Sequence, residues 1–436
     1  MSFVPASQKT SAGLLIDPVI LTRSLPFIEY RQEELYIEGV SALTLSQQYG
    51  TPTYVYSKNA IIQAYQAYHQ SFGALPHQIC YAVKANSNLA VLNVLAKLGA
   101  GFDIVSKGEL ARVLQVTDGK KVVYSGVGKT FDDIEFALKA DIDCFNVEAI
   151  SELELINQVA TTLNKKARIS LRINPDVDAK THPYISTGMK DNKFGISHEQ
   201  AVSAYQYAQS LPMLEIVGID CHIGSQLEEV QPFVDALSRL ALLIDELKAV
   251  GIYLKHIDIG GGLGVRYIDE NPVSTHDYIQ ALLPQLSALG LTVYCEPGRN
   301  MVANAGVLLT TVDVLKPTEF KNFAIVDASM SELIRPALYD SKMAIIPTRQ
   351  QPQAQLQCWD VVGSVCESSD FLAKERALAL CVGEVLAVTG AGAYGFTMAS
   401  NYNSRPLPCE VMVEEGMHRV IRQRQRLEQL WQDEVI

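Results

Sequence analysis

A lysine at position 84 follows directly on an apolar run, in the string YAVKANSN (81–88). A charge is costly to bury there, and partial burial lowers the pKa of an amine and makes it a competent Schiff-base former. The alternative is a strand-end lysine whose stem covers apolar surface while its amine reaches water. Taken alone, Lys84 fits the alternative better.

Three consecutive glycines, Gly260, Gly261 and Gly262, lie in the string IDIGGGLG (257–264). Without side chains, the backbone can approach an anion closely and point its N–H groups at it, which favours a phosphate site. The spacing is not that of the dinucleotide fingerprint, and the Lys-Ser/Thr pair of the P-loop is missing. A tight turn from strand to helix explains the glycines equally well.

Glu296 and Arg299 end a further strand candidate, in the string CEPGR (295–299), where a proline and Gly298 fix the backbone between them. Such a pair can hold a cationic ring nitrogen and an anionic group at the same time. The alternative is a surface ion pair beside a turn.

His222 and Ser225 follow an apolar run in the string DCHIGSQ (220–226). Histidine titrates near neutral pH, and a serine hydroxyl can donate a hydrogen bond to an anion. A lone histidine at such a position is more often a satisfied core or rim residue than a catalyst.

Two residue pairs in the last third of the chain have suggestive spacing. Arg335 and Tyr339 are four residues apart and so share one face of a helix, where an arginine suits bidentate recognition of a carboxylate. Cys366 followed by Glu367 offers a proton donor beside an amine-binding carboxylate. Cysteine is often apolar filling, so Cys366 alone is weak support for a site.

Each of these groups is ambiguous alone, but their combination points to one kind of cofactor. A lysine nucleophile, a phosphate cradle, an anion for a ring nitrogen and arginines for substrate carboxylates are the parts needed around pyridoxal phosphate. No cluster of residues in the sequence has metal-ligand spacing. The sequence therefore predicts a cofactor site without a metal.

The elements that must position these groups alternate between β-rich runs, beginning with TPTYVYS (51–57), and helical patterns. Eight or nine such units over about 250 residues fit a (β/α)8 barrel, with an open doubly wound sheet as the alternative. After residue 300 the runs read as strands with few helices between them. We expect an N-terminal segment over 1–47 whose strand at 34–39 joins the later β domain, a barrel over 48–300 and a β domain over 301–436.

The composition excludes several classes of protein. The chain has 436 residues, 48% of them hydrophobic, and a net charge of −12, which argues against nucleic acid or an anionic membrane as the main partner. We find no apolar run of about 18 residues and no secretory leader pattern. The eight scattered cysteines suggest neither a disulfide framework nor a zinc site, so a reducing cytoplasm is the expected location.

Over about residues 30–425 the chain resembles the fold-type III pyridoxal-phosphate decarboxylases, which share the alanine-racemase fold. The matching strings are, in order, YAVKANSN, GAGFDIVSKGEL, THPYISTGMKDNKFGI, DCHIGSQL, HIDIGGGLGVRY, EPGR, IRPALY, CES-DFL and GAYGF-M-SNYNSRP. It is most similar to the members that convert meso-2,6-diaminopimelate to L-lysine and CO2, the last step of lysine biosynthesis. The resemblance implies a homodimer of chains with an α/β TIM barrel followed by a C-terminal β-sandwich or β-barrel domain.

The resemblance also implies a role for each matching residue toward pyridoxal 5′-phosphate. Lys84 forms the internal aldimine, His222 stacks on the pyridine ring, and Glu296 pairs with the protonated ring nitrogen. The phosphate is held by Ser225, Gly260, Gly261, Gly262 and Tyr394. The cofactor-binding set is completed by Asp103, Gly298 and Arg299.

Toward the substrate, the resemblance implies that the distal carboxylate, which is kept, is bound by Arg299, Arg335 and Tyr339, and that Tyr394 also belongs to the substrate-binding set. Glu367 contacts the distal amine, and Cys366 reprotonates the α-carbon after CO2 leaves. The implied catalytic set is Lys84, His222 and Cys366. Cys366 and Glu367 reach the site from the partner subunit of the homodimer.

Physical chemistry supports two of these roles independently. A carboxylate at Glu296 keeps the ring nitrogen protonated and the ring electron-poor, whereas the related racemases place an arginine there, so the glutamate favours decarboxylation. The arginines favour diaminopimelate over ornithine, arginine or lysine. The alternatives are decarboxylation of a D-amino acid, a carboxylated polyamine or a carrier-bound amino acid, and a cofactor-binding protein without catalysis.

The chain departs from the family pattern at two positions. Ser364, in GSVCESSD (363–370), stands where proline is frequent, and Lys107 stands where a small residue or an arginine is common. The segment THPYISTGMKDNKFGI (181–196) has the composition of a lid near the site, with an ordinary surface loop as the alternative.

Overall fold

The computed structural model describes residues 7–10, 13–177 and 193–436, and the chain divides into two compact units. The barrel unit comprises the described residues of 64–264 and 272–301, and the β unit those of 1–63, 265–271 and 302–436. Most of the predicted lid falls outside the described residues. None of the helices described is long and apolar enough to cross a membrane.

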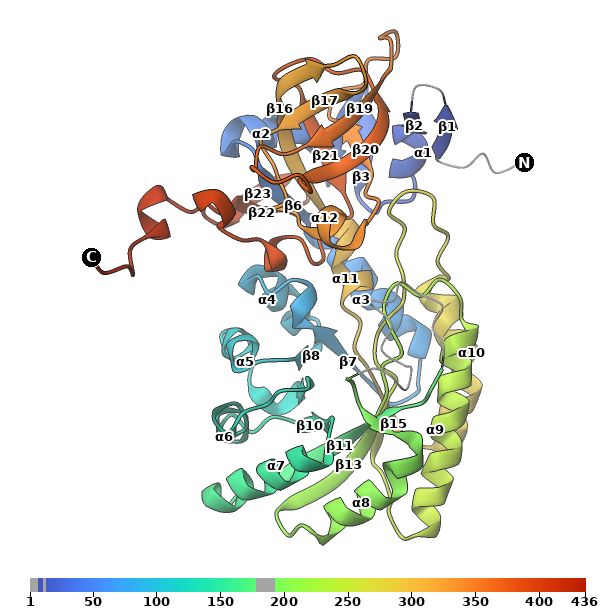
Figure 1. Cartoon of the computed structure of the whole chain (residues 1–436). Coiled ribbons are helices and arrows are strands. Elements are labelled where there is room, and N and C mark those ends of the chain that lie inside the picture. The colour runs from blue at the N-terminus through green and yellow to red at the C-terminus, as the bar shows by residue number, and fades with distance from the viewer. Residues whose placement is uncertain (1–6, 11–12, 178–192) are drawn as a thin grey trace. The chain divides into compact units, whose positions relative to one another are not determined.

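In the described part of the barrel unit, eight parallel strands form a closed ring. Figure 1 labels several of these strands and the helices outside them. The ring closes because β15 pairs with β7 and β10 pairs with β11. This confirms the predicted (β/α)8 barrel over an open doubly wound sheet. In ring order the strands are β7 (His77–Ala82), β8 (Gly101–Ile104), β9 (Val122–Tyr124), β10 (Cys144–Val147), β11 (Ala167–Asn174), β13 (Leu214–Asp220), β14 (His256–Asp258) and β15 (Thr292–Cys295).

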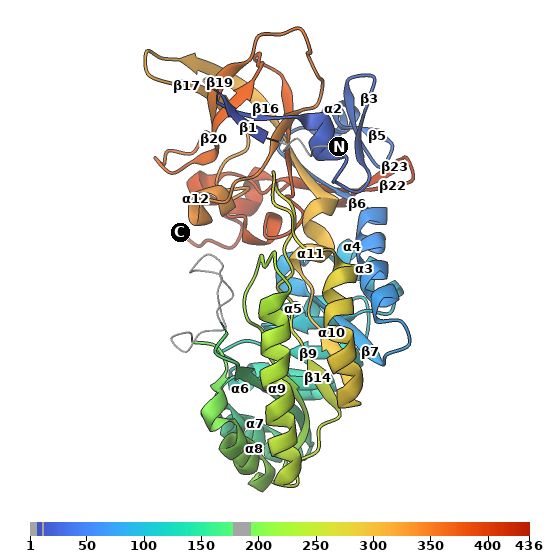
Figure 2. The same ribbon diagram turned by 90° about the vertical axis from the view of Figure 1, so that its right-hand side faces the viewer.

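Helices follow the strands and pack on the outside of the ring. In α9 (Gln231–Ala249), Leu237, Leu240 and Leu247 are buried on one face at helical spacing, which is why this segment folds as an amphipathic helix. It lies beside α10 (Thr275–Leu289), as Figure 2 shows. The other helices of this part of the chain are α3 (Lys58–Phe72), α4 (Leu89–Lys97), α5 (Lys107–Val113), α6 (Phe131–Lys139), α7 (Ile150–Leu163), α8 (Ala201–Ser210) and α11 (Arg299–Val302).

The described residues of the β unit form an eleven-stranded and a three-stranded sheet, which confirms the predicted β-rich domain. Leu309, Leu45 and Val411, from β16, α2 and β22, share one buried cluster. The elements are β1 (Ser7–Thr10), β2 (Gly13–Ile16), α1 (Pro18–Thr22), β3 (Ile28–Arg31), β4 (Glu34–Ile37), β5 (Val40–Ser41), α2 (Ala42–Tyr49), β6 (Thr53–Ser57), β16 (Gly306–Pro317), β17 (Asn322–Val326), α12 (Arg335–Tyr339), β18 (Ile345–Pro347), β19 (Gln357–Val362), β20 (Phe371–Leu378), β21 (Val385–Thr389), β22 (Cys409–Glu414) and β23 (Met417–Arg422).

The boundary between the units differs from the sequence expectation. The run at 51–57, which we counted as a barrel strand, forms β6 between β16 and β22 of the β unit. All of β6 is buried, so its continuous apolar pattern is indistinguishable in sequence from that of a barrel strand. The barrel unit begins at residue 64 rather than 48. The strand expected at 34–39 is β4, and its Leu35 N–H donates to the Thr348 carbonyl oxygen at 2.8 Å within the β unit.

Replacing Lys129 by methionine should lower the stability of the barrel unit by about 3 to 5 kcal/mol, because it leaves a buried carboxylate uncompensated. The Lys129 side chain is 1% exposed. Its Nζ donates to the carbonyl oxygens of Gly126 (2.9 Å) and Asn146 (2.7 Å) and to Glu152 Oε1 (2.6 Å). Thermal denaturation should show a melting temperature lower by roughly 10 °C.

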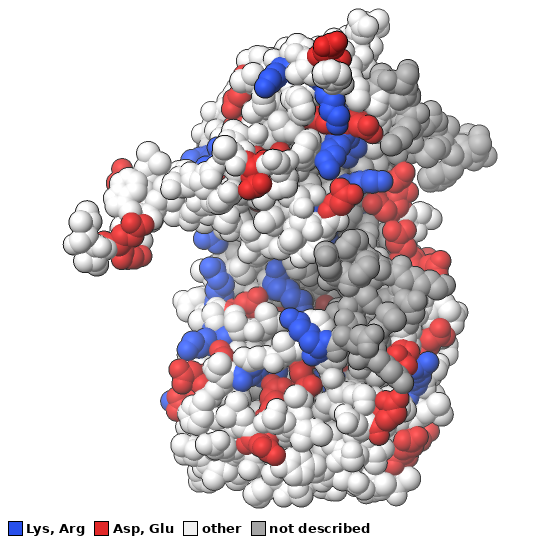
Figure 3. Space-filling model, in the orientation of Figure 1, with Lys and Arg blue, Asp and Glu red and all other residues white. Residues whose placement is uncertain are grey.

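Lys139→Met is the matched control for this variant. Lys139 pairs with Glu135 at 3.0 Å on the surface of α6, and its side chain is 56% exposed. Charges of both signs intermix over the visible surface in Figure 3, and exposed pairs of this kind contribute about 0 to 1 kcal/mol. Equal melting temperatures for the two variants would show that burial of Lys129 does not matter.

Candidate active site

The carboxyl ends of the barrel strands carry all the predicted cofactor residues except Tyr394. Because all strands of the ring run in the same direction, the loops that follow them meet at one end of the barrel. By strand, these residues are Lys84 after β7, Asp103 in β8, His222 and Ser225 after β13, Gly260, Gly261 and Gly262 after β14, and Glu296, Gly298 and Arg299 after β15.

Lys84 lies in a single 3-10 turn (Val83–Ala85) directly after β7. Its Nζ is 3.3 Å from Asp103 Oδ2, and its side chain is 40% exposed whereas that of Asp103 is 0% exposed. Asp103 Oδ1 has no hydrogen-bond partner among the described residues. A buried carboxylate therefore orients an accessible amine and retains an oxygen for a further donor.

The three glycines form a turn in which a side chain at any of the three positions would clash with neighbouring backbone. Gly260 and Gly262 have φ angles of +65° and +107°, in the region that glycine adopts most readily. A Cβ at Gly261 would lie 2.3 Å from the Glu296 carbonyl oxygen, and one at Gly262 would lie 2.4 Å from that of Gly224. This close-packed backbone fits the predicted role of presenting N–H groups to a phosphate.

His222 contacts the glycine turn as a neutral imidazole. Its Nδ1 accepts a hydrogen bond from the Gly261 N–H at 3.2 Å. Burial, together with the positive charges of Arg172 and Lys84, holds the pKa of His222 well below its usual value. The ring is therefore uncharged at neutral pH, which suits stacking against a flat heterocycle.

Arg299 begins α11 and is buried beside Ser225. Its Nη2 and Nε donate to Ser225 Oγ at 3.0 and 3.3 Å. At the preceding position, a Cβ on Gly298 would lie 3.0 Å from Ala82 Cβ at the end of β7, so the close approach of these two strand ends requires a small residue. The arrangement places a cation next to the serine that was assigned to the phosphate.

Glu296 is buried just after β15, and neutral donors hold it. Its Oε1 accepts hydrogen bonds from Asn146 Nδ2 at 3.1 Å and from Ser125 Oγ at 3.3 Å. Burial raises the pKa of Glu296 well above its usual value, and neighbouring carboxylates raise it further. A carboxylate in this environment is stabilised by a cationic partner, which a protonated ring nitrogen would supply.

Two aspartates that the sequence analysis missed lie next to Glu296. One carboxylate oxygen from each of Asp220, Asp258 and Glu296 lies within 4.8 Å of the other two, and all three residues are buried. Burial raises the pKa of Asp258 to about 7. Buried carboxylates this close share protons at neutral pH. Each aspartate is the last residue of its strand, β13 or β14, and that position is the signal that could have found both.

Replacing Asp258 by asparagine should stabilise the cofactor-free protein more at pH 8 than at pH 5, and not at pH 3. Because burial raises the pKa of Asp258 from 3.8 to about 7, the folded protein keeps its full stability below about pH 4, loses stability as the pH rises, and completes that loss near pH 7. Asparagine removes the charge but can still accept the Gly260 N–H, which donates to Asp258 Oδ1 at 2.9 Å. Melting temperatures of variant and parent should diverge as the pH rises; a constant difference would contradict the buried charge.

Arg172, near the end of β11, is a further residue that the sequence analysis missed. Its Nη1 lies 2.9 Å from Glu148 Oε1, and its Nε lies 4.0 Å from Asp220 Oδ2. The side chain is buried, so this cation offsets part of the negative charge of the carboxylate cluster. An arginine between the apolar residues Leu171 and Ile173, in the string RISLRINP (168–175), is the signal for it.

The remaining predicted residues lie in the β unit. Arg335 and Tyr339 are the first and last residues of α12. Arg335 is buried, and its guanidinium donates to the Tyr267 hydroxyl at 2.6 Å and to Ser341 Oγ at 3.3 Å. These local contacts fix the direction of the Arg335 side chain.

Tyr394 also lies in the β unit. It has a φ angle of +55°, a left-handed conformation that is uncommon for a tyrosine.

Cys366 and Glu367 are exposed in the loop between β19 and β20. The Cys366 N–H donates to Asn403 Oδ1 at 3.0 Å, and the Tyr402 hydroxyl lies 3.4 Å from Glu367 Oε2. A thiol and a carboxylate thus share one short loop of the β unit.

Comparisons with known proteins place the chain in a family. Residues 58–303 match the family model of the pyridoxal binding domain of pyridoxal-dependent decarboxylases. The chain is 54% identical to a diaminopimelate decarboxylase of Pseudomonas aeruginosa and 56% identical to one of Vibrio cholerae, each over 93% of this chain and 98% of the relative. The crystal structure of diaminopimelate decarboxylase from Helicobacter pylori complexed with L-lysine aligns with a TM-score of 0.86 at 45% identity, over 89% of this chain and 98% of that one. This chain belongs to the diaminopimelate decarboxylase family, a group of pyridoxal-dependent carboxy-lyases.

Proposed function

We propose that this chain converts meso-2,6-diaminopimelate to L-lysine and CO2 with pyridoxal 5′-phosphate as cofactor, as the last step of lysine biosynthesis. The observation that carries the proposal is the buried side chain of Glu296 at the carboxyl end of the barrel, where its Oε1 accepts a hydrogen bond from Asn146. The two relatives that are named diaminopimelate decarboxylase, at 54% and 56% identity to this chain, support the proposed substrate. The eight cysteines are free, which fits the reducing cytoplasm that we propose as the location.

The residues at the carboxyl end of the barrel fit this cofactor. Lys84 would hold it covalently through Nζ, with Asp103 orienting the amine. The glycine turn and Ser225 would bind the phosphate, and the uncharged face of His222 would stack on the ring. When bound, pyridoxal phosphate supplies an electron-poor ring that accepts the electron pair left by the departing CO2. Tyr394, Gly298 and Arg299 complete the proposed cofactor-binding set.

Glu296 would keep that ring electron-poor. Burial raises its pKa well above the usual value, which favours a protonated Glu296 while no cationic partner is present. In contact with a ring nitrogen, the same proton would lie between the two groups and hold the nitrogen cationic. Ser125 and Asn146 would stabilise the carboxylate that results, since both donate to its Oε1.

The substrate would be recognised at both ends. Arg299, Arg335 and Tyr339 would bind the distal carboxylate, because an arginine matches a carboxylate in charge and in geometry. Glu367 would contact the distal amine, and Cys366 would give its proton to the α-carbon once CO2 has left. We propose that Cys366 and Glu367 act from the partner subunit of a homodimer.

The test of the substrate is CO2 release from cofactor-loaded protein with meso-diaminopimelate, L-lysine, L-ornithine or L-arginine offered separately. Release from meso-diaminopimelate alone, with L-lysine as the product, is expected. Release from one of the other amino acids would leave the cofactor chemistry intact and overturn the assignment of the distal carboxylate to Arg299, Arg335 and Tyr339.

The shared site has its own test. Lys84→Ala and Cys366→Ala homodimers should each be nearly inactive. After the two variants are mixed and exchange subunits, half of the dimers carry one site with both native residues, so about a quarter of the parental activity should return. No recovery, with subunit exchange verified by mass, would place Cys366 and Lys84 of one site on the same chain.

A further inference from the structure

The loop that carries Cys366 and Glu367 is closed by one aspartate at its base. We define the cysteine loop as residues 363–370, between β19 and β20. The side chain of Asp370 is buried, and its two carboxylate oxygens accept the N–H groups of Met330 at 2.6 Å and Val365 at 2.9 Å. The Gly363 N–H donates to the Asp370 carbonyl oxygen at 3.2 Å, which joins the two ends of the loop. These bonds fix the base of the loop. The exposed residues of the loop, Ser364 and Cys366–Ser369, depend on contacts with other segments.

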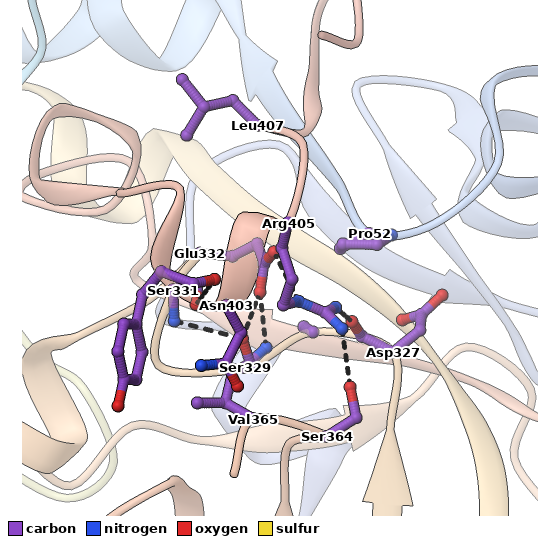
Figure 4. Close-up of polar contacts among 12 residues, drawn as sticks. Pro52, Asp327, Ser329, Ser331, Glu332, Ser364, Val365, Asn403, Arg405 and Leu407 are labelled. Carbon is purple, nitrogen blue, oxygen red and sulfur yellow. Dashed lines mark hydrogen bonds and ion pairs between the residues drawn. The ribbon is translucent and has the colours of Figure 1, made fainter. Parts of the chain in front are cut away.

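Arg405 supplies such a contact from a segment 41 residues further along the chain. Its Nη1 donates to Ser364 Oγ at 2.7 Å, and its Nη2 donates to the Asp327 carbonyl oxygen. Figure 4 shows the guanidinium reaching between Asp327 and Ser364, with both hydrogen bonds drawn. The arginine therefore connects the start of the cysteine loop to the end of β17.

The other side of Arg405 is anchored to a buried acid. Its Nε lies 3.5 Å from Glu332 Oε1, and the Glu332 side chain is 2% exposed. Glu332 Oε2 in turn accepts the N–H and the hydroxyl of Ser329, each at 2.7 Å. Because its partners are held in place, the guanidinium acts as a rigid fork rather than as a mobile surface cation.

Asn403 and Tyr402, in the same segment, contact the tip of the loop. Asn403 Oδ1 accepts the Cys366 N–H at 3.0 Å, and the Tyr402 hydroxyl lies 3.4 Å from Glu367 Oε2. Asn403 has a φ angle of +53°, which asparagine tolerates better than most residues. The segment 402–405 thus reaches Ser364, Cys366 and Glu367.

The contact to Ser364 gives a physical meaning to a departure from the family pattern. The resembling decarboxylases frequently have a proline at this position, which fixes φ and narrows the conformations open to the chain. A serine does not restrain its own backbone, but its hydroxyl can be held from outside. Among the described residues, the Ser364 N–H makes no hydrogen bond that a proline would remove.

We propose that Arg405, acting through Ser364, and Asn403, acting through the Cys366 N–H, are positioning residues that hold the cysteine loop in its working conformation. The Arg405–Ser364 hydrogen bond takes the place of the restraint that a proline would give. The inference rests on the proposed function, in which Cys366 donates the proton and Glu367 binds the distal amine. Because the two residues share the loop, loosening it changes proton delivery and substrate binding together.

The central variant is Ser364→Ala, which removes the acceptor without disturbing the ion pair between Arg405 and the buried Glu332. It should lower kcat for meso-diaminopimelate by about three- to tenfold and raise KM by a similar factor. Ser364→Pro should restore both constants to within about twofold of the parent, because it restrains the loop in another way. Asn403→Ala should resemble Ser364→Ala.

Ser368→Ala is the matched control. Ser368 is an exposed serine of the same loop, and its hydroxyl makes no hydrogen bond within the described residues. Its kinetic constants should equal those of the parent. Hydrogen exchange of the peptide over 363–370 gives a readout that is independent of turnover: exchange should quicken in Ser364→Ala and return to the parental rate in Ser364→Pro.

Cys366→Ala separates a failure of this inference from a failure of the proposed function. If Cys366→Ala slows turnover while Ser364→Ala and Asn403→Ala leave kcat, KM and exchange unchanged, the positioning role is wrong and the proton donor stands. If Cys366→Ala does not slow turnover, the proposed donor is wrong, and the positioning role falls with it. A lower melting temperature of Ser364→Ala with unchanged kinetic constants would reduce Arg405 to a purely structural role.

Discussion

Replacing Lys84 by alanine should lower the rate of decarboxylation by at least about 10³-fold, which corresponds to about 4 kcal/mol of lost transition-state stabilisation. The physical reason is that the accessible amine at the end of β7 is the group proposed to hold the cofactor covalently. The variant should still fold, because the truncated side chain is only partly buried and leaves no large cavity. The measurements are single-turnover CO2 release and the visible absorption of the purified protein, both of which should be lost.

Lys107→Ala is the control for this experiment. Lys107 is exposed near the start of α5, and its Nζ lies 3.9 Å from Asp132 Oδ2, which is a weak surface contact. This lysine is also a departure from the family pattern, so unchanged turnover and absorption in Lys107→Ala would show that the departure is neutral. Visible absorption together with turnover in Lys84→Ala would remove Lys84 from the mechanism.

The barrel, and the position of most of the proposed cofactor residues at the ends of its strands, could be predicted because they depend on local signals. A parallel barrel brings the ends of all its strands together, so a polar residue directly after an apolar run points to the site wherever that run lies in the chain. Lys84, His222 and Glu296 each follow such a run, and the structure places all three at the carboxyl ends of β7, β13 and β15. Their predicted roles remain proposals.

What could not be predicted depends on contacts between distant segments. The strand-end positions of Asp220 and Asp258 could have marked both residues as facing the site. Their proximity to Glu296 becomes evident only when β13, β14 and β15 pair side by side and bring three carboxylates together. The run at 51–57 has the apolar pattern of a barrel strand but pairs in the β unit, because pairing partners are not encoded in the pattern of one strand. The contact of Arg405 with Ser364 could not be predicted either, because the two residues lie 41 positions apart in the sequence.

Replacing Glu296 by glutamine should lower kcat by about 10²- to 10³-fold while KM changes by only a few-fold, because the carboxylate acts on charge that develops in the transition state. Glutamine fits the same space, and its amide oxygen can still accept from Ser125 and Asn146. It cannot carry the negative charge that holds a ring nitrogen cationic. The cofactor should remain bound, since Lys84 and the glycine turn are untouched, and this distinguishes the variant from Lys84→Ala.

Glu154→Gln is the matched control, because this exposed glutamate accepts a hydrogen bond from the Tyr207 hydroxyl at 2.9 Å on the outer surface of α7. It should leave kcat and cofactor absorption unchanged. Asp258 gives a second comparison. If the three carboxylates only exchange protons with one another, Asp258→Asn should change the pH dependence of kcat more than the highest value of kcat. Glu296→Gln should instead lower kcat at every pH. Full turnover by Glu296→Gln would mean that the ring needs no cationic nitrogen here, and the preference for decarboxylation would then have to come from the residues that face the substrate.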